Sequence, residues 1–194
     1  MKITMIRHGK TAGNLEKRYV GRTDESLSEL GIEEASARKE TLFLEGIEAV
    51  FVSPKRRCLE TASILFGKSE QIVIENLREC DFGDFEMKNW QDLEGNEDYQ
   101  KFIDSNGMLP FPNGEGMLSF QARCMKGFEE VLLYCQNHGI KEHIVMVVHG
   151  GTIMSVCSYL MDEIEEYFKY SCDNVGGYVI MLEGENVTCI QRLA

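Results

Sequence analysis

Short apolar runs alternate with helical patterns along most of the chain, and this alternation constrains the fold more than any other feature. The expected strands are Lys2–Ile6, Ala49–Val52, Ile72–Ile74 and His143–Val148, with a closing hairpin of 177–182 and 186–190 around Glu183-Gly184-Glu185. The expected helices are 28–44, 55–66, 117–137 and 152–161. Strands that alternate with helices predict an α/β fold, a three-layer sandwich around a mostly parallel sheet.

The stretch from Asp84 to Gly116 interrupts this alternation. We expect it to be a small lid insertion over one end of the sheet, within a single domain of residues 1–194; residues 84–116 are called the lid segment below. Between Asp84 and Asp104 it carries seven acidic residues and only two basic ones, Lys88 and Lys101. Such a surface repels a substrate that bears a second phosphate.

Three of the predicted strands end at polar clusters. The clusters are Arg7-His8-Gly9, Ser53-Pro54-Lys55-Arg56-Arg57 and His149-Gly150-Gly151. Ligands of open α/β sheets bind at the carboxyl ends of strands, so neighbouring strands would bring two imidazoles and at least two guanidiniums into one crevice. Gly9 and Gly150 allow backbone N–H groups to approach a ligand, and the following helix N-termini favour anions. The pattern therefore predicts a phosphate site.

The same motifs are compatible with metal binding and with purely structural roles. Two histidines and a carboxylate also bind non-haem iron, although Arg7 beside His8 opposes a dication and the close His-x-Asp/Glu spacing is missing. Each motif alone is also compatible with a core histidine or with a helix start at Pro54. His138 and His143 flank a helix-to-strand connection, where we expect surface positions.

The motifs together resemble those of a known family. Arg7-His8-Gly9-Lys10-Thr11 with Asn14 resembles the opening motif of the histidine phosphatase superfamily, in the branch named for phosphoglycerate mutase. The segments that match in order are 21–24, 53–57, Leu77-Arg78-Glu79-Cys80-Asp81-Phe82-Gly83, 112–115 with Arg123, and 148–151. Two positions depart from the pattern: Lys10 stands where the family often has Glu, and Met87 stands where a Gly often follows Phe85-Glu86.

The resemblance implies a phosphatase that forms a phosphohistidine on His8. It implies that Arg7, Arg57 and a protonated His149 surround the phosphoryl group, and that Glu79 is the general acid, with Asp81 and Glu86 as nearby alternatives. The substrate-binding residues that it implies are Gly9, Asn14, Gly21, Arg22 and Gly150. It also implies that no metal and no organic cofactor is needed, so EDTA should leave the activity unchanged.

The substrate implied by the resemblance is a small phosphate monoester. Short members with such a Leu-Arg-Glu-Cys-Asp-Phe-Gly segment resemble alpha-ribazole phosphatases of cobalamin synthesis, and aromatic residues near the lid segment could receive a flat leaving group. The alternatives are a phosphoglycerate mutase, a broad sugar-phosphate or phosphoglycerate phosphatase, and a non-catalytic phosphate-binding protein.

The composition narrows the partners and the compartment. A net charge of −12 disfavours nucleic acid and anionic membranes as partners. The apolar stretches are too short for a membrane span or a signal peptide, so we expect a cytoplasmic protein. Seven cysteines without a CxxC pair predict reduced and mostly buried thiols. The sequence does not decide between a monomer and a homodimer.

Overall fold

A single six-stranded sheet organises the fold in the computed structural model, which describes residues 1–184 and 186–193. The strands are β1 Lys2–Arg7, β2 Ile47–Val52, β3 Gln71–Val73, β4 His143–Val148, β5 Gly177–Glu183 and β6 Asn186–Arg192. Their order is β3-β2-β4-β1-β5-β6, with the first four parallel to one another and the β5–β6 hairpin antiparallel. The predicted mostly parallel sheet is confirmed. Glu185 of the predicted hairpin turn lies outside the described residues.

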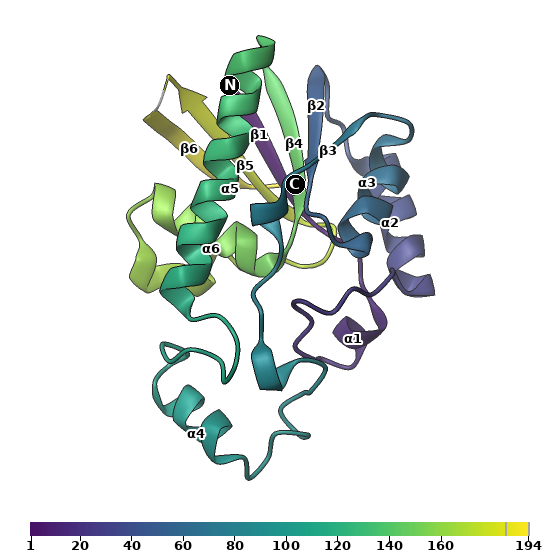
Figure 1. Cartoon of the computed structure of the whole chain (residues 1–194). Helices are drawn as coiled ribbons and strands as arrows, with labels where there is room; N and C mark the ends of the chain where they lie inside the picture. Colours follow the sequence, from purple (N-terminus) through teal and green to yellow (C-terminus); the bar gives the residue numbers. More distant parts are fainter. Residues whose placement is uncertain (185, 194) are drawn as a thin grey trace.

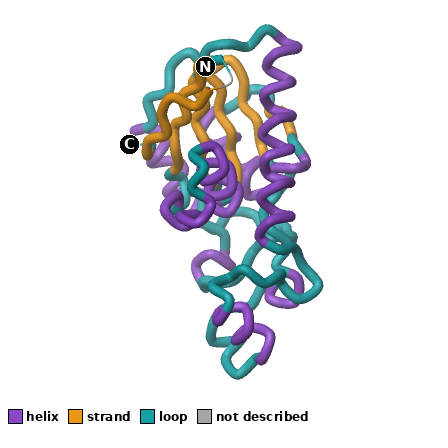
Figure 2. Tube along the Cα trace, turned by 90° about the vertical axis from the view of Figure 1, so that its left-hand side faces the viewer, coloured by secondary structure: helices purple, strands orange, loops and turns teal. Residues whose placement is uncertain are grey.

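Helices cover both faces of this sheet (Figures 1 and 2). They are α1 Ala12–Leu15, α2 Glu29–Thr41, α3 Arg56–Phe66, α4 Glu97–Asp104, α5 Met117–His138 and α6 Gly150–Leu160, with 3₁₀ helices η1 Glu75–Leu77, η2 Gly83–Phe85 and η3 Ile164–Tyr170. Alternate β4 side chains point to opposite faces, as in any strand. Ile144 and Met146 pack with α5 and α6, whereas Val145 and Val147 pack with α3. This arrangement is the predicted three-layer sandwich.

The lid segment lies beyond one end of the sheet, and Figure 1 shows α4 as its most distant element. None of the residues in α4 is buried, so this helix contributes little to the main core. An aromatic cluster attaches the segment instead, with Phe85 in contact with the rings of Tyr19, Phe102 and Phe111. These rings attach the lid segment to the loop that carries Tyr19, and ion pairs of Asp92 with Arg18 and of Glu115 with Arg123 attach it elsewhere.

The structure differs from the predicted elements at several helix ends. The second helix stops at Thr41 rather than near Leu44, because Leu42 already has an extended backbone. The short helices α1, α4 and η3 are not in the predicted set. Two of them begin at local caps: the side chains of Thr11 and Asn96 each accept a hydrogen bond from a backbone N–H in the first turn.

Buried polar and sulfur groups complete the fold. His143 is buried rather than on the surface, because its ring bonds to the Thr4 hydroxyl at 2.9 Å and to the Glu45 carbonyl at 2.7 Å. The cysteines are free and all but Cys189 are buried, as predicted. Across residues 1–184 and 186–193, no helix combines the length and the apolar character that crossing a membrane requires.

Candidate active site

The carboxyl ends of β1, β2 and β4 meet at one edge of the sheet. The register pairs Arg7 of β1 with Val148 of β4, and the His8 N–H donates to the Val148 carbonyl at 3.0 Å. The next residue, His149, therefore starts level with His8, and the two ring centroids are 5.2 Å apart. The structure thus brings the predicted strand-end motifs together in one site.

The His8 ring is buried and has a defined tautomer. Its Nδ1 lies 2.6 Å from the Gly9 carbonyl oxygen, which can only accept, so Nδ1 carries the proton. Burial lowers the pKa of His8 well below its usual 6.5, and the nearby Arg57 guanidinium lowers it further. Nε2 of His8 is therefore an unprotonated nitrogen with a free lone pair, which is the form that a nucleophile needs.

The surroundings of His149 favour its neutral ring, whereas the resemblance implies an imidazolium. Its Nδ1 accepts a hydrogen bond from the Arg57 Nε at 3.3 Å, so its proton resides on Nε2, which lies 2.7 Å from the Ser53 hydroxyl. Burial lowers the pKa of His149 well below 6.5, and the charge of Arg57 adds to this effect. A cation already in contact with the ring makes a second positive charge unfavourable.

Arg57 is fully buried and almost fully bonded. Besides its bond to His149, its Nη1 donates to the Thr23 carbonyl at 2.8 Å, and its Nη2 donates to the carbonyls of Val20 at 3.3 Å and Gly21 at 3.0 Å. A guanidinium has five N–H groups, so these bonds leave one Nη1 hydrogen for a ligand. The residues 20–23 therefore determine how Arg57 is oriented.

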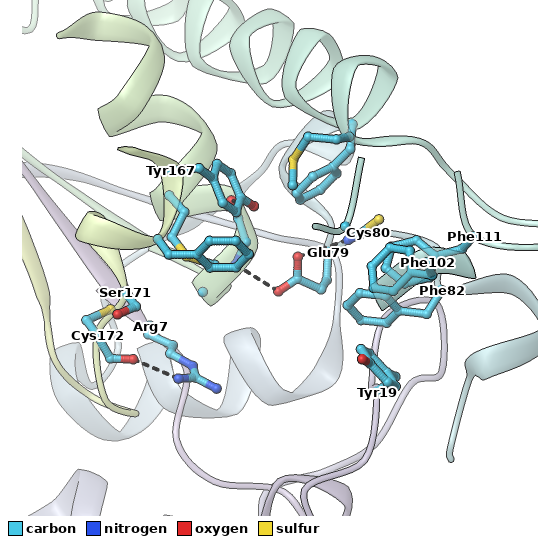
Figure 3. A pocket seen from close by; sticks show the side chains of 17 residues that line it. Arg7, Tyr19, Glu79, Cys80, Phe82, Phe102, Phe111, Tyr167, Ser171 and Cys172 are labelled. Carbon is cyan, nitrogen blue, oxygen red and sulfur yellow. Dashed lines mark hydrogen bonds between the residues drawn. The ribbon is translucent and has the colours of Figure 1, made fainter. Parts of the chain in front are cut away.

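Arg7 points its guanidinium into the pocket, as Figure 3 shows. Its Nη1 donates to the Cys172 carbonyl at 2.7 Å, whereas its Nε is buried without a hydrogen-bond partner among the described residues. A side chain on Gly150 would lie 3.4 Å from this Nε, so Gly150 lies against the guanidinium. His149 is the N-cap of α6, whose N-terminus begins at this point and favours an anion.

Glu79 faces the same pocket from the segment that follows η1 (Figure 3). Its carboxyl oxygens accept from the N–H groups of Cys80 at 2.9 Å and Gly151 at 3.2 Å. Burial raises the pKa of Glu79, and these two donors offset the rise only in part. A buried carboxyl group with a raised pKa can hold the proton that a general acid must deliver.

The two alternative acids are occupied elsewhere. Asp81 accepts from the Gly83 N–H at 2.9 Å and lies 3.6 Å from the Arg22 guanidinium. Glu86 accepts several hydrogen bonds from residues 21–23. Neither side chain lines the pocket, whereas Glu79 does. The geometry therefore favours Glu79 as the acid.

Arg123 supports the site through contacts that the sequence motifs do not indicate. Its guanidinium pairs with Glu115 at 2.6 Å and donates to the carbonyls of Asn76, Arg78 and Glu79. It thereby fixes the main chain that carries the acid. The sequence pattern does not reveal these contacts, because any residue type supplies a backbone carbonyl.

The predicted substrate-binding residues fall into two groups. Gly150 lines the pocket. The Oδ1 of Asn14 accepts from the Thr11 N–H at 3.2 Å, so the Nδ2 of Asn14 points away from Thr11. The Gly9 N–H donates to the Thr61 hydroxyl and the Gly21 N–H donates to Glu86. Arg22 points to Asp81. The backbone donors of Gly9 and Gly21 thus stabilise the protein's own loops.

The pocket itself has a volume of about 340 Å³ and mostly apolar walls. Its aromatic lining residues are Tyr19, Phe82, Phe102, Phe111, Phe120, Tyr167 and Phe168. Figure 3 shows Tyr167 on one side of Glu79, and Phe82, Phe102 and Phe111 on the other. The sequence analysis does not predict that η3 forms part of the pocket wall. The aromatic residues of Ile164–Tyr170 are the sequence feature that could have indicated this role.

Metal-binding side chains are not grouped at this site. Within the part of the chain that the structure describes, no cluster of three or more His, Cys, Asp or Glu has the geometry to hold a metal ion. His8 and His149 instead use ring nitrogens for bonds to a carbonyl, a hydroxyl and a guanidinium.

Comparisons with known proteins identify the family of the chain. A sequence model of the histidine phosphatase superfamily (branch 1) matches residues 3–192. The adenosylcobalamin/alpha-ribazole phosphatase of Escherichia coli is 30% identical over 166 residues, which cover 83% of this chain and 79% of that protein.

Two solved structures are similar over nearly the whole chain. The alpha-ribazole phosphatase of Shigella flexneri has a TM-score of 0.83 and 25% identity, covering 97% of this chain and 94% of that chain. A phosphoserine phosphatase mutant of Entamoeba histolytica, solved in complex with phosphoserine, has a TM-score of 0.79 and 27% identity, covering 97% of this chain and 95% of that chain.

Proposed function

We propose a substrate class for this chain, which belongs to branch 1 of the histidine phosphatase superfamily and is a phosphatase. The substrates are phosphate monoesters whose leaving group carries a flat aromatic ring, alpha-ribazole phosphate among them. The observation that carries this choice is the pocket wall, in which aromatic rings flank Glu79 on two sides. The family resemblance of the sequence motifs is confirmed, and the relatives named as phosphatases support an enzyme over the non-catalytic alternative.

In the first step, the Nε2 of His8 attacks phosphorus in line with the leaving oxygen. The N–P bond forms while the P–O bond breaks, and the proton of Glu79 moves to the departing oxygen. The Nδ1–H bond to the Gly9 carbonyl stabilises the positive charge that the ring acquires. The Nε of Arg7 and the remaining N–H of Arg57 hold the equatorial phosphoryl oxygens, where negative charge accumulates.

In the second step, water attacks the phosphohistidine. Glu79, now a carboxylate, accepts a proton from the water as its oxygen bonds to phosphorus, and the N–P bond breaks. Inorganic phosphate leaves, His8 regains its neutral ring, and Glu79 is protonated again. The proposed lid segment, residues 84–116 within the single domain, limits the access of bulk water to this chemistry.

The pocket also favours an aromatic leaving group over one that carries a second anion. Within the described part of the chain, Arg7 is the only Arg or Lys that lines the pocket. Arg18, which could reach a second anion in principle, pairs with Glu16 and Asp92, and Arg22 lies beside Asp81. A mutase must hold two anionic groups, and in this proposal the guanidiniums of Arg7 and Arg57 are both used by one phosphoryl group.

A substrate panel tests the proposal. We expect kcat/KM for alpha-ribazole phosphate to exceed that for 3-phosphoglycerate, phosphoserine and fructose bisphosphates by about ten-fold or more, since stacked rings contribute ~0.5–1.5 kcal/mol per pair. The His8→Ala protein should stay folded, lose turnover and form no acid-labile phosphoprotein. A preference for the carboxylated substrates would refute the aromatic assignment. Conversion of 3-phosphoglycerate to its isomer with 2,3-bisphosphoglycerate present would favour the mutase alternative.

A further inference from the structure

The Glu86 carboxylate lies among five hydrogen-bond donors. It accepts from the backbone N–H groups of Gly21 at 3.2 Å, Arg22 at 2.8 Å and Thr23 at 3.3 Å. The Thr23 hydroxyl donates to it at 2.7 Å and the Phe82 N–H at 3.1 Å. Successive backbone N–H groups that converge on one point form a concavity suited to an anion, and here a side chain of the protein occupies it.

The carbonyl groups of the same loop bind Arg57. The oxygens of Val20, Gly21 and Thr23 each accept from its guanidinium, so residues 20–23 contact Glu86 through N–H groups and Arg57 through carbonyls. Arg57 has no solvent exposure and also donates to His149. The shape of this loop therefore sets the position of a cation next to both histidines.

The loop has little freedom to adjust on its own. A side chain at Gly21 would lie 1.8 Å from the Cys80 carbonyl oxygen, so the backbone is packed tightly there. Glu86 is held as well, because the Met87 N–H donates to the Tyr19 carbonyl at 2.8 Å and the Tyr19 N–H donates to the Lys88 carbonyl at 2.9 Å. A change in the Glu86 carboxylate is thus passed to the loop.

We propose that Glu86 is a positioning residue for the phosphate site: its carboxylate shapes residues 20–23, and the carbonyls of this loop align Arg57. The inference depends on the proposed role of Arg57 at the phosphoryl group, and it adds a residue that touches neither substrate nor nucleophile. The main path from Glu86 to the phosphate site runs through Arg57, so most of its effect disappears where Arg57 is missing.

The substitution Glu86→Gln tests this dependence with little change in shape. The amide keeps one acceptor oxygen but turns an NH₂ group toward backbone donors, so part of the loop loses its partner. A displacement of a phosphate-binding group by about 1 Å costs about 100-fold in rate. We expect kcat/KM for p-nitrophenyl phosphate to fall by about that factor, mainly through kcat.

A double-mutant cycle separates positioning from a general loss of stability. Glu86→Gln should lower kcat/KM about 100-fold in the parent and in the Arg7→Ala protein, but less than about three-fold in the Arg57→Ala protein. The matched control is Glu94→Gln, which removes an exposed carboxylate from the same lid segment and should leave kcat/KM unchanged. Thermal unfolding of each variant shows whether it is folded.

The outcomes distinguish the two proposals. If Glu86→Gln lowers activity equally in the Arg57→Ala and Arg7→Ala backgrounds, the positioning role is wrong. If Arg57→Ala alone keeps full activity, the proposed use of Arg57 in catalysis is wrong and the inference falls with it. If Glu86→Gln does not fold, the substitution Thr23→Val replaces it in the cycle, since it removes one donor to the same carboxylate. A several-fold loss of kcat/KM that vanishes in the Arg57→Ala background supports the positioning role. A loss of the same size in both backgrounds overturns it.

Discussion

Removing the Phe85 ring should loosen the lid segment relative to the rest of the molecule. Phe85 is 1% exposed and forms ring contacts with Tyr19, Tyr99, Phe102 and Phe111, at centroid distances of 6.2, 5.5, 6.1 and 5.8 Å. Replacing a buried Phe with Ala costs about 3–5 kcal/mol. Because α4 has no buried residue, this loss falls on the lid segment rather than on the sheet.

Amide hydrogen exchange measures where that free energy is lost. A cost of this size, at about 1.4 kcal/mol for each factor of ten, raises the opening equilibrium of residues 82–111 by between ~10² and ~10⁴. Amides of β1 and β4 should exchange as in the parent, because their protection comes from the core. Three of the rings that contact Phe85, those of Tyr19, Phe102 and Phe111, also line the pocket, so KM for aromatic substrates should rise in the Phe85→Ala protein.

Trp90→Ala is the matched control, since Trp90 lies in the same segment but is 57% exposed. Its effect on stability should stay within about 0.5 kcal/mol. Unchanged exchange of residues 82–111 in Phe85→Ala would show that the aromatic cluster does not hold the lid segment. Faster exchange throughout the sheet would show instead that lid and core unfold as one unit.

Two further predictions concern Glu79 and Met87. Because burial raises the pKa of Glu79, its proton is lost as pH rises through that pKa, and activity falls on the alkaline side; Glu79→Gln should remove this alkaline limb and lower kcat for alkyl phosphates by about 10²–10⁴. The leaving group of p-nitrophenyl phosphate needs no acid, but hydrolysis of the phosphohistidine still needs the Glu79 base. The Glu79→Gln protein should therefore release a burst of nitrophenolate and then turn over slowly. Met87 has a φ of 60°, which an L side chain disfavours, so Met87→Gly should stabilise the protein by up to about 1 kcal/mol in urea unfolding.

The sheet was predictable because its strands are short apolar runs flanked by glycines and helical patterns. β4 is buried at all six positions, which is the signature of a central parallel strand. The helix α4 was not in the prediction, because it is only eight residues long and its apolar face, Tyr99 and Phe102, packs on Phe85 within the lid segment rather than on the sheet. The Gly that the family often has at position 87 also has a physical reason here, namely the positive φ of Met87.

The strand-end residues of the site were predictable because each follows an apolar run directly. The loop contacts were not, since Glu86 and Arg123 act through bonds to backbone groups distant in sequence. The hydrogen-bond roles of the His149 ring were not predictable for a related reason. A motif shows that a histidine is present, but only the bond from the Arg57 Nε shows that its Nδ1 is an acceptor.

Burial of the site explains how a nucleophile and an acid coexist near neutral pH. It lowers the pKa of His8 and His149 and raises the pKa of Glu79, so all three shift toward their uncharged forms. In water, the imidazole would be partly protonated and the carboxyl would be ionised, which is the wrong form for each role.

With those groups neutral, the charges left at the phosphate site are the guanidiniums of Arg7 and Arg57, which match the dianion of a phosphate monoester. The net charge of −12 on the whole chain acts mostly across solvent, where screening over about 8 Å weakens it, whereas these cations act at contact distance. Bulk water beyond the molecule that attacks the phosphohistidine therefore harms catalysis twice. It ionises Glu79 before the proton is needed, and it weakens the attraction between the guanidiniums and the phosphate.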